Sequence, residues 1–217
     1  KISYINAIAA VAESVGADID DVVTGLGLDS RIGQSFLRPG PGWGGSCLPK
    51  DTSALIRIAA DAGYDFSLMK DAVKVNRQQF ERVVDKVRRV AGEPLEGRTI
   101  AVWGLTFKAG TDDLRDSPAI EVARQLVAEG AKVRAYDPEV AAGADVLEGV
   151  EVVDDPYACC DGADALVVLT EWPEFSRMDL DRVAAALAQR AVVDTRNVLD
   201  RAALARREFT YQGIGRV

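Results

Sequence analysis

The sequence predicts an α/β protein in which a helical half is followed by a Rossmann-like, doubly wound parallel sheet. In the first half, apolar residues recur every three or four positions, which is the period of helices that pack on a core. After a compact break at residues 93–97, short apolar runs alternate with helical patterns. This alternation is typical of parallel strands joined by crossover helices. We therefore predict a helical domain over residues 1–92 and a sheet domain over residues 97–217.

The helical half contains four predicted helices. They run from Ile2 to Val15, from Asp18 as N-cap to Leu26, from Cys47 to Ala62, and from Ser67 to Gly92. Glycines at or just past the ends of these patterns are typical helix stops. Residues 29–46 between the second and third helix are irregular and rich in glycine and proline. A long irregular loop in a compact protein is commonly functional.

The second half contains the strands of the predicted sheet. We expect strands at Thr99–Trp103, Lys132–Tyr136, Ala165–Leu169, Ala191–Asp194 and Tyr211–Ile214, with helices at Pro118–Glu129, Pro156–Cys160 and Leu180–Leu187. The turn after the first strand lacks the G-x-G-x-x-G spacing of a dinucleotide fingerprint. The sheet domain is therefore a poor NAD site on its own.

Composition excludes several classes of function. A net charge of −8 argues against a nucleic-acid partner, because such proteins usually carry an excess of Lys and Arg. The absence of histidine removes Ser-His-Asp and Cys-His catalysis and the usual metal clusters. Three cysteines in this spacing form neither a disulfide framework nor a zinc pattern, and we expect Cys159 and Cys160 to have no function. The sequence has no apolar run long enough to span a membrane, so we expect a cytoplasmic protein. From the missing histidines and the cysteine spacing we also expect no bound metal.

The strongest chemical feature is the segment from Gly42 to Asp51, where a glycine-rich loop runs into the start of a helix. Cys47 then lies near the helix N-terminus, where the helix dipole favours a thiolate. Lys50 and Asp51 follow three and four residues later and project on the same face. A lone cysteine is more often a buried structural residue. The Gly-Gly-Ser-Cys-x-x-Lys-Asp context favours a nucleophile.

Other polar positions are ambiguous on the sequence alone. Arg31 is either a ligand contact or a solvated charge, and Trp43 either stacks on a ligand or anchors its loop. Lys108 and Arg115 lie near a helix N-terminus and could bind an anion, although each alone is more commonly a surface charge. Asp137 precedes a proline, so we interpret it as part of a turn and assign it no ligand.

The glycine-rich segment with Cys47 resembles the active-site signature of the nucleotide-sugar 6-dehydrogenases of the UDP-glucose/GDP-mannose dehydrogenase family. The resemblance extends along the chain through Gly16-Ala17-Asp18, residues 29–33, residues 36–40, Lys108 with Arg115, Thr170-Glu171-Trp172 and Asp194-Thr195-Arg196. Serine before the cysteine favours the UDP-glucose branch. The alternatives are a GDP-mannose or UDP-N-acetylmannosamine dehydrogenase, or a non-catalytic nucleotide-sugar-binding or dimerisation module.

The resemblance implies an NAD-dependent, four-electron oxidation of UDP-glucose to UDP-glucuronate for polysaccharide biosynthesis. It assigns Cys47 as the nucleophile, through a thiohemiacetal and a thioester, and Asp51 as the residue that positions or activates water. It assigns Lys50 and Arg115 to NAD. The residues that it assigns to the UDP-sugar are Arg31, Phe36, Leu37, Arg38, Pro39, Gly40, Gly44, Phe107, Lys108 and Arg196.

The resemblance also implies partners and a missing part. The helical domain is expected to form a homodimer in which Arg31 reaches the neighbouring subunit. Family members carry an amino-terminal NAD domain, and a catalytic lysine and asparagine, before the position of Lys1. We therefore expect the 217-residue chain to lack the NAD domain and to be inactive alone.

Overall fold

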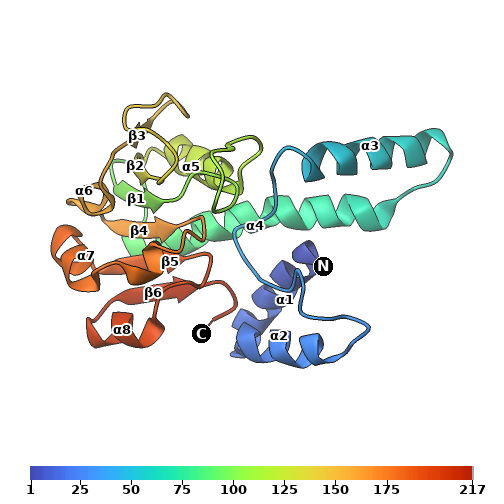
Figure 1. Cartoon of the computed structure of the whole chain (residues 1–217), viewed down its shortest axis with the longest axis horizontal. Helices are drawn as coiled ribbons and strands as arrows, with labels where there is room; N and C mark the ends of the chain where they lie inside the picture. Colours follow the sequence, from blue (N-terminus) through green and yellow to red (C-terminus); the bar gives the residue numbers. More distant parts are fainter. Residues whose placement is uncertain (217) are drawn as a thin grey trace.

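The computed structural model describes residues 1–216 and has the predicted α/β architecture (Figure 1). Four helices form the first half: α1 (Ile2–Val15), α2 (Ile19–Leu28), α3 (Leu48–Asp61) and α4 (Ser67–Ala91). Each agrees with the predicted helix to within two residues. Asp18 caps α2 as predicted, because its side chain accepts a hydrogen bond from the backbone N–H of Asp20 at 2.9 Å.

The second half is a six-stranded, entirely parallel sheet with the strand order β3-β2-β1-β4-β5-β6. This order is that of a doubly wound Rossmann-like fold. The strands are β1 (Thr99–Trp103), β2 (Lys132–Tyr136), β3 (Val150–Val152), β4 (Ala165–Val168), β5 (Ala191–Asp194) and β6 (Thr210–Gly213). The helices are α5 (Pro118–Ala128), α6 (Pro156–Cys160), α7 (Leu180–Ala186), α8 (Arg201–Arg206) and the 3₁₀ turn η1 (Phe175–Arg177).

Three short elements were absent from the sequence-based prediction. They are β3 with three residues, η1 with three and α8 with six. Elements this short contain too few residues for a hydrophobic period to be detected. They form because neighbouring elements hold them, as β2 does for β3 through the pairing of Val133 with Val150.

The apolar core divides at the sheet rather than between the two halves of the chain. One cluster joins α1, α4 and α5 to one sheet face and includes Val83, Val87 and Ile100, each fully buried. The other cluster covers the opposite face and includes Trp103 and Phe175, whose rings stack 5.1 Å apart. The carboxyl-terminal half of α4 therefore packs on the sheet. The division at residues 93–97 stays a prediction, since packing crosses it.

Gly215 and Arg216, which follow β6, also bond to the helical half of the chain. Ile19 of α2 donates its backbone N–H to the carbonyl of Gly215 at 2.8 Å, and Gly215 donates to Glu13 Oε1 at 2.6 Å. Arg216 pairs with Asp20 at 2.7 Å. A Cβ at Gly215 would lie 2.5 Å from Ile19, so this close contact requires glycine.

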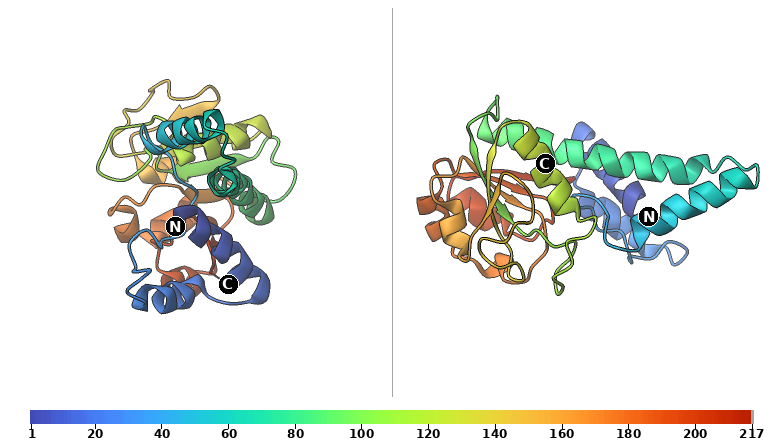
Figure 2. Two further views of the ribbon diagram at one scale, coloured as in Figure 1. Left: turned by 90° about the vertical axis from the view of Figure 1, so that its right-hand side faces the viewer. Right: turned by 90° about the horizontal axis from the view of Figure 1, so that it is seen from above.

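An arm made of α3 and the first half of α4 projects from this body (Figures 1 and 2). None of the 14 residues of α3 is buried, although Leu55 and Ile58 are apolar and are 43% and 64% exposed. Most helices in proteins are stabilised by packing of an apolar face, which the single chain does not provide for α3. Within residues 1–216, no helix combines the length and apolar character needed to cross a membrane.

We expect Ile100→Ala to lower the free energy of unfolding by about 2–5 kcal/mol, because it leaves a cavity in the core cluster that joins α4 and α5 to the sheet. Lys132→Ala, at an exposed position of the neighbouring strand, is the control and should change it by less than about 0.5 kcal/mol. Urea denaturation followed by circular dichroism measures both. Equal effects of the two substitutions would contradict the core assignment.

Candidate active site

Cys47 is the N-cap residue of α3 and is exposed. Pro49 occupies the first turn, where a proline costs no hydrogen bond because the first amides of a helix are unpaired in any case. The helix begins with the backbone N–H of Asp51 donating to the carbonyl of Cys47 at 3.0 Å. Ser46 Oγ lies 3.8 Å from the sulfur. The thiol is thus accessible to reagents, whereas Cys159 and Cys160 are buried.

Lys50 and Asp51 form an ion pair beside the thiol, with Nζ 2.6 Å from Oδ1. The hydrogen bond to Asp51 is the largest cause that raises the pKa of Lys50, and proximity to Cys47 adds a smaller effect in the same direction. Both side chains are about two-thirds exposed, at 68% and 66%. The first turn of α3 therefore presents a sulfur, a cation and a carboxylate together, as the sequence predicted.

The glycine loop before Cys47 is docked on the sheet half of the chain. Gly45 donates its backbone N–H to the carbonyl of Asp116 at 3.2 Å. A Cβ at Gly44 would lie only 1.9 Å from that carbonyl oxygen, and one at Gly45 would lie 2.9 Å from the ring of Phe107. Only glycine permits so close an approach. This contact brings the predicted residues Gly44 and Phe107 together across the two halves.

The turn between β1 and α5 supplies cations to the same region. Arg115 pairs with Asp113 at 2.8 Å, and this interaction holds the pKa of Asp113 at about 2. The same pair is the main cause that raises the pKa of Arg115, and proximity to Cys47 contributes a little. Lys108 is exposed, with Nζ 5.2 Å from the centre of the Phe107 ring. The turn thus places Arg115 near the thiol and Lys108 beside the Phe107 ring.

Arg196 follows β5 and lies beside Gly40 of the irregular loop. A Cβ at Gly40 would be 3.2 Å from Arg196 Nη1. The guanidinium donates from Nε to the carbonyl of Leu169 at 2.8 Å and pairs with Glu171 at 3.0 Å. Burial lowers its pKa. Arg196 is therefore largely enclosed, and its nearest predicted site neighbour is Gly40.

The remaining loop residues occupy different environments. Arg31 pairs with Asp29 at 2.5 Å, and the Arg31 side chain is 87% exposed. Phe36 has a φ of 66° and is 70% exposed. Leu37, in contrast, is 1% exposed and packs in the core. The Leu37 side chain holds the loop in place and is not presented to a ligand in this structure.

The next two loop residues after Leu37 are at least partly exposed. Arg38 is exposed, and Pro39 is half-buried between Arg38 and the buried Gly40. The loop therefore enters the core twice, at Leu37 and again from Gly40, and exposes side chains between these points. An alternation of this kind is what a segment needs if it is both anchored and open to a ligand.

Asp137 is a structural residue, as predicted from the proline beside it. It is 1% exposed and accepts hydrogen bonds from the backbone N–H groups of Leu105 and Thr106 and from Trp172 Nε1 at 2.7–3.2 Å. Its carboxylate therefore shapes the turn after β1 and is not available to a ribose. The sheet half does not fit a dinucleotide at this turn.

Sequence reasoning missed three buried amides that contact the irregular loop. Asn6 and Gln79 bond to the backbone of Gly40, and Asn76 bonds to the backbone of Trp43. The signal available was polar residues on the apolar stripe of a helix, such as positions 76 and 79 between Val73 and Val83. Trp43 itself is a loop anchor, since its Nε1 donates to Ser3 Oγ at 2.8 Å.

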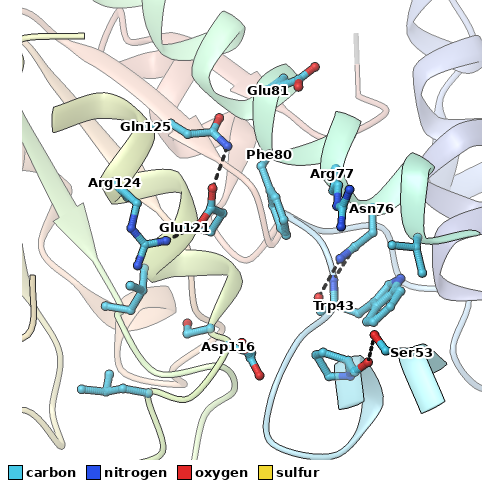
Figure 3. Close-up of a pocket in the computed structure, with 15 residues that line it drawn as sticks. Trp43, Ser53, Asn76, Arg77, Phe80, Glu81, Asp116, Glu121, Arg124 and Gln125 are labelled. Atoms are coloured by element: carbon cyan, nitrogen blue, oxygen red, sulfur yellow. Dashed lines mark hydrogen bonds and ion pairs between the residues drawn. The ribbon is translucent and has the colours of Figure 1, made fainter. Parts of the chain in front are cut away.

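A pocket of about 580 Å³ lies beside the Cys47 turn, between the start of α3, α4 and α5 (Figure 3). Trp43, Asn76, Phe80 and Asp116 are among its lining residues, and Cys47 is not. Figure 3 shows the Trp43 and Asn76 side chains on one side and the Glu121, Arg124 and Gln125 side chains of α5 on the other. The pocket therefore adjoins the loop that carries the thiol.

Comparison with known proteins relates this geometry to a family. Residues 1–78 match the model of the central domain of the UDP-glucose/GDP-mannose dehydrogenase family, and residues 101–201 match its UDP-binding domain. Over its whole length the chain is 46% identical to a UDP-glucose 6-dehydrogenase of Rhizobium meliloti and 44% identical to UDP-glucose 6-dehydrogenase TuaD of Bacillus subtilis. It spans about half of these relatives, 50% and 47% of their lengths.

A solved structure gives the same result. A UDP-glucose dehydrogenase from Pyrobaculum islandicum superimposes with a TM-score of 0.86 at 35% identity, over all of this chain and 48% of that one. The matched regions include the loop and turn that meet at Gly44 and Asp116. The chain therefore belongs to the UDP-glucose/GDP-mannose dehydrogenase family and contains its central and UDP-binding regions.

Proposed function

We propose that this chain carries the thiol and the UDP-sugar contacts of a dehydrogenase that oxidises UDP-glucose to UDP-glucuronate with NAD. The observation that carries the proposal is the exposed Cys47 at the N-cap of α3, beside Lys50 and Asp51. The loop before it is docked on the Phe107 and Asp116 turn of the UDP-binding region. Relatives named UDP-glucose 6-dehydrogenase support the choice of substrate.

Oxidation of a primary alcohol to a carboxylate needs a group that retains the carbon between two oxidations. The Cys47 sulfur adds to the aldehyde carbon as a thiohemiacetal and holds the same carbon, after loss of a second hydride, as a thioester. Attack of water on the thioester releases the carboxylate and returns the thiol. Asp51, in the first turn of α3, orients that water and accepts its proton.

Two NAD molecules, when bound in turn, would each accept one hydride, the first from the alcohol and the second from the thiohemiacetal. The residues of this chain that fit the cofactor are Lys50 and Arg115, because both are exposed cations near Cys47 and suit a pyrophosphate. The turn after β1 does not fit it, since Asp137 is committed to the backbone there. The role of this chain toward NAD is therefore to contact its phosphates from one side.

The proposed UDP-sugar surface consists of the loop from Arg31 to Gly44 together with Phe107, Lys108 and Arg196. Lys108 is free for a phosphate, because no ion pair engages it within residues 1–216. Arg196 and Gly40 are adjacent across the two halves, which suits a ligand held between loop and sheet. The arrangement favours an anionic ligand that touches both halves of the chain.

Iodoacetamide should alkylate Cys47 near neutral pH faster than it alkylates a free thiol, because the sulfur is exposed at a helix N-terminus and lies near Lys50 and Arg115. UDP-glucose should slow the reaction by covering the sulfur. Mass spectrometry of the alkylated peptides measures both rates. Cys47→Ser is the control and should leave only the slow labelling of the buried Cys159 and Cys160.

A Cys47 that reacts no faster than a free thiol, and that UDP-glucose does not protect, would refute the nucleophile assignment. Such a result would favour a non-catalytic nucleotide-sugar-binding or dimerisation module. The control variant ensures that labelling is read at the exposed thiol.

Calorimetric titration should show binding of UDP and much weaker binding of GDP. Lys108→Ala should weaken UDP binding by about tenfold or more, because a charge-assisted hydrogen bond to phosphate contributes about 1.5–3 kcal/mol. Lys132→Ala removes an exposed lysine on the amino end of β2 and should leave the affinity unchanged. Tight GDP binding without UDP binding would identify the GDP-mannose branch instead.

The arm formed by α3 and α4 supports a homodimer through the helical half of the chain. A 14-residue helix without a buried residue, and with Leu55 and Ile58 exposed, lacks the apolar packing that stabilises helices of this length. A second copy supplies the same apolar surface in a two-fold arrangement. The proposed interface therefore lies along the arm, where it leaves the sheet half open to ligands.

Ile58→Asp should shift the chain from dimer to monomer, because it places an unpaired charge in the proposed apolar interface. Sedimentation velocity across a range of concentrations measures the shift. Lys132→Glu, also an exposed position but on β2, is the matched surface control and should remain dimeric. A wild-type chain that sediments as a monomer at all concentrations would overturn the proposed interface.

A further inference from the structure

The irregular loop has a continuous buried segment in its middle. Residues 40–42 are buried, whereas Phe36 upstream and Cys47 downstream are exposed. The buried segment thus lies between Phe36 of the proposed UDP-sugar surface and the proposed nucleophile, Cys47. Whatever holds this segment fixes the position of one relative to the other.

Three amide side chains hold it. Gly40 donates its N–H to Asn6 Oδ1 at 2.9 Å and accepts from Gln79 Nε2 at 2.8 Å. Asn76 accepts from the N–H of Trp43 and donates to its carbonyl, both at 2.8 Å. Both backbone groups of Gly40 and both of Trp43 are therefore paired with side chains of α1 and α4. Figure 3 shows the Asn76 contact with Trp43.

These amides are poorly suited to a role in helix packing alone. Asn6 and Gln79 are 1% and 2% exposed, and within residues 1–216 neither Asn6 Nδ2 nor Gln79 Oε1 has a hydrogen-bond partner. A buried polar atom without a partner is destabilising, and an apolar side chain of the same shape avoids that cost. What the amides provide in return is the fixed backbone of Gly40.

We propose that Asn6, Asn76 and Gln79 are positioning residues that set the Cys47 loop relative to the UDP-sugar surface. They act through the backbone of Gly40 and Trp43 and touch neither substrate nor thiol. The inference rests on the proposed function, because it concerns the geometry of that site. We call these three amides the clamp. The clamp fixes the loop relative to α1 and α4, and the contact of Gly44 and Gly45 with Asp116 fixes it relative to the sheet half.

Gln79→Met tests the proposal with a side chain of similar length that lacks both polar atoms. We expect it to fold with little loss of stability, and to raise the UDP-glucose concentration that half-protects Cys47 from iodoacetamide by about fivefold, the effect of one typical hydrogen bond. Asn76→Leu removes two bonds and should have a larger effect. Gln189→Met, at a glutamine that bonds to Asp164 in the sheet half and does not line the pocket beside the Cys47 turn, is the matched control and should match wild type.

Hydrogen exchange supplies a readout that needs no ligand. Peptides covering residues 40–47 should exchange faster in Gln79→Met and Asn76→Leu, whereas sheet peptides should not change. Faster exchange with unchanged UDP-glucose protection would overturn the positioning role, and so would a Gln79→Met chain that does not fold. If UDP-glucose fails to protect even wild type, the proposed function fails, and unchanged exchange in the variants would separately refute the clamp.

Discussion

The close approach of the glycine loop to the turn before α5 is the contact on which the arrangement of the site depends. Gly44 and Gly45 meet the carbonyl of Asp116 and the ring of Phe107 at distances that exclude any Cβ. Because Cys47 follows two residues later, this contact decides where the thiol lies relative to the sheet. The glycines are therefore needed less for flexibility than for proximity.

A rigid frame is required for such a contact to be reproducible. The frame is α4, which runs for 25 residues from the tip of the arm to the sheet and packs its buried end, including Val83 and Val87, on β-strands. The chain terminus adds a second fastening, where Gly215 bonds to Ile19 and to Glu13. The thiol, its loop and the UDP-binding region thus move as parts of one packed body.

Local charge at the site contrasts with that of the whole chain. The net charge is −8, yet Lys50 and Arg115 lie near the exposed thiol, and Lys108 lies on the same turn as Arg115. Asp51 and Asp113 each pair with one of these cations, which orients it and offsets part of its charge, whereas Lys108 has no ion-pair partner within residues 1–216. A local cluster of this kind attracts phosphate and pyrophosphate even when the protein as a whole is acidic. The net charge therefore argues against nucleic acid as a partner, and the local cations favour a small phosphate-containing ligand.

The sequence alone predicted the parallel α/β class, the order of all elements except β3, η1 and α8, and the position of Cys47 at a helix start. Periodicity and capping are local, so Asp18, Gly16 and the helix start at Cys47 could be located without tertiary information. Only the tertiary structure decided which candidate side chains are exposed and which are packed in the core. Leu37 lies in the core, and the amides of Asn76 and Gln79 face the loop. Neither position could be predicted, because each depends on packing between segments that are far apart in sequence.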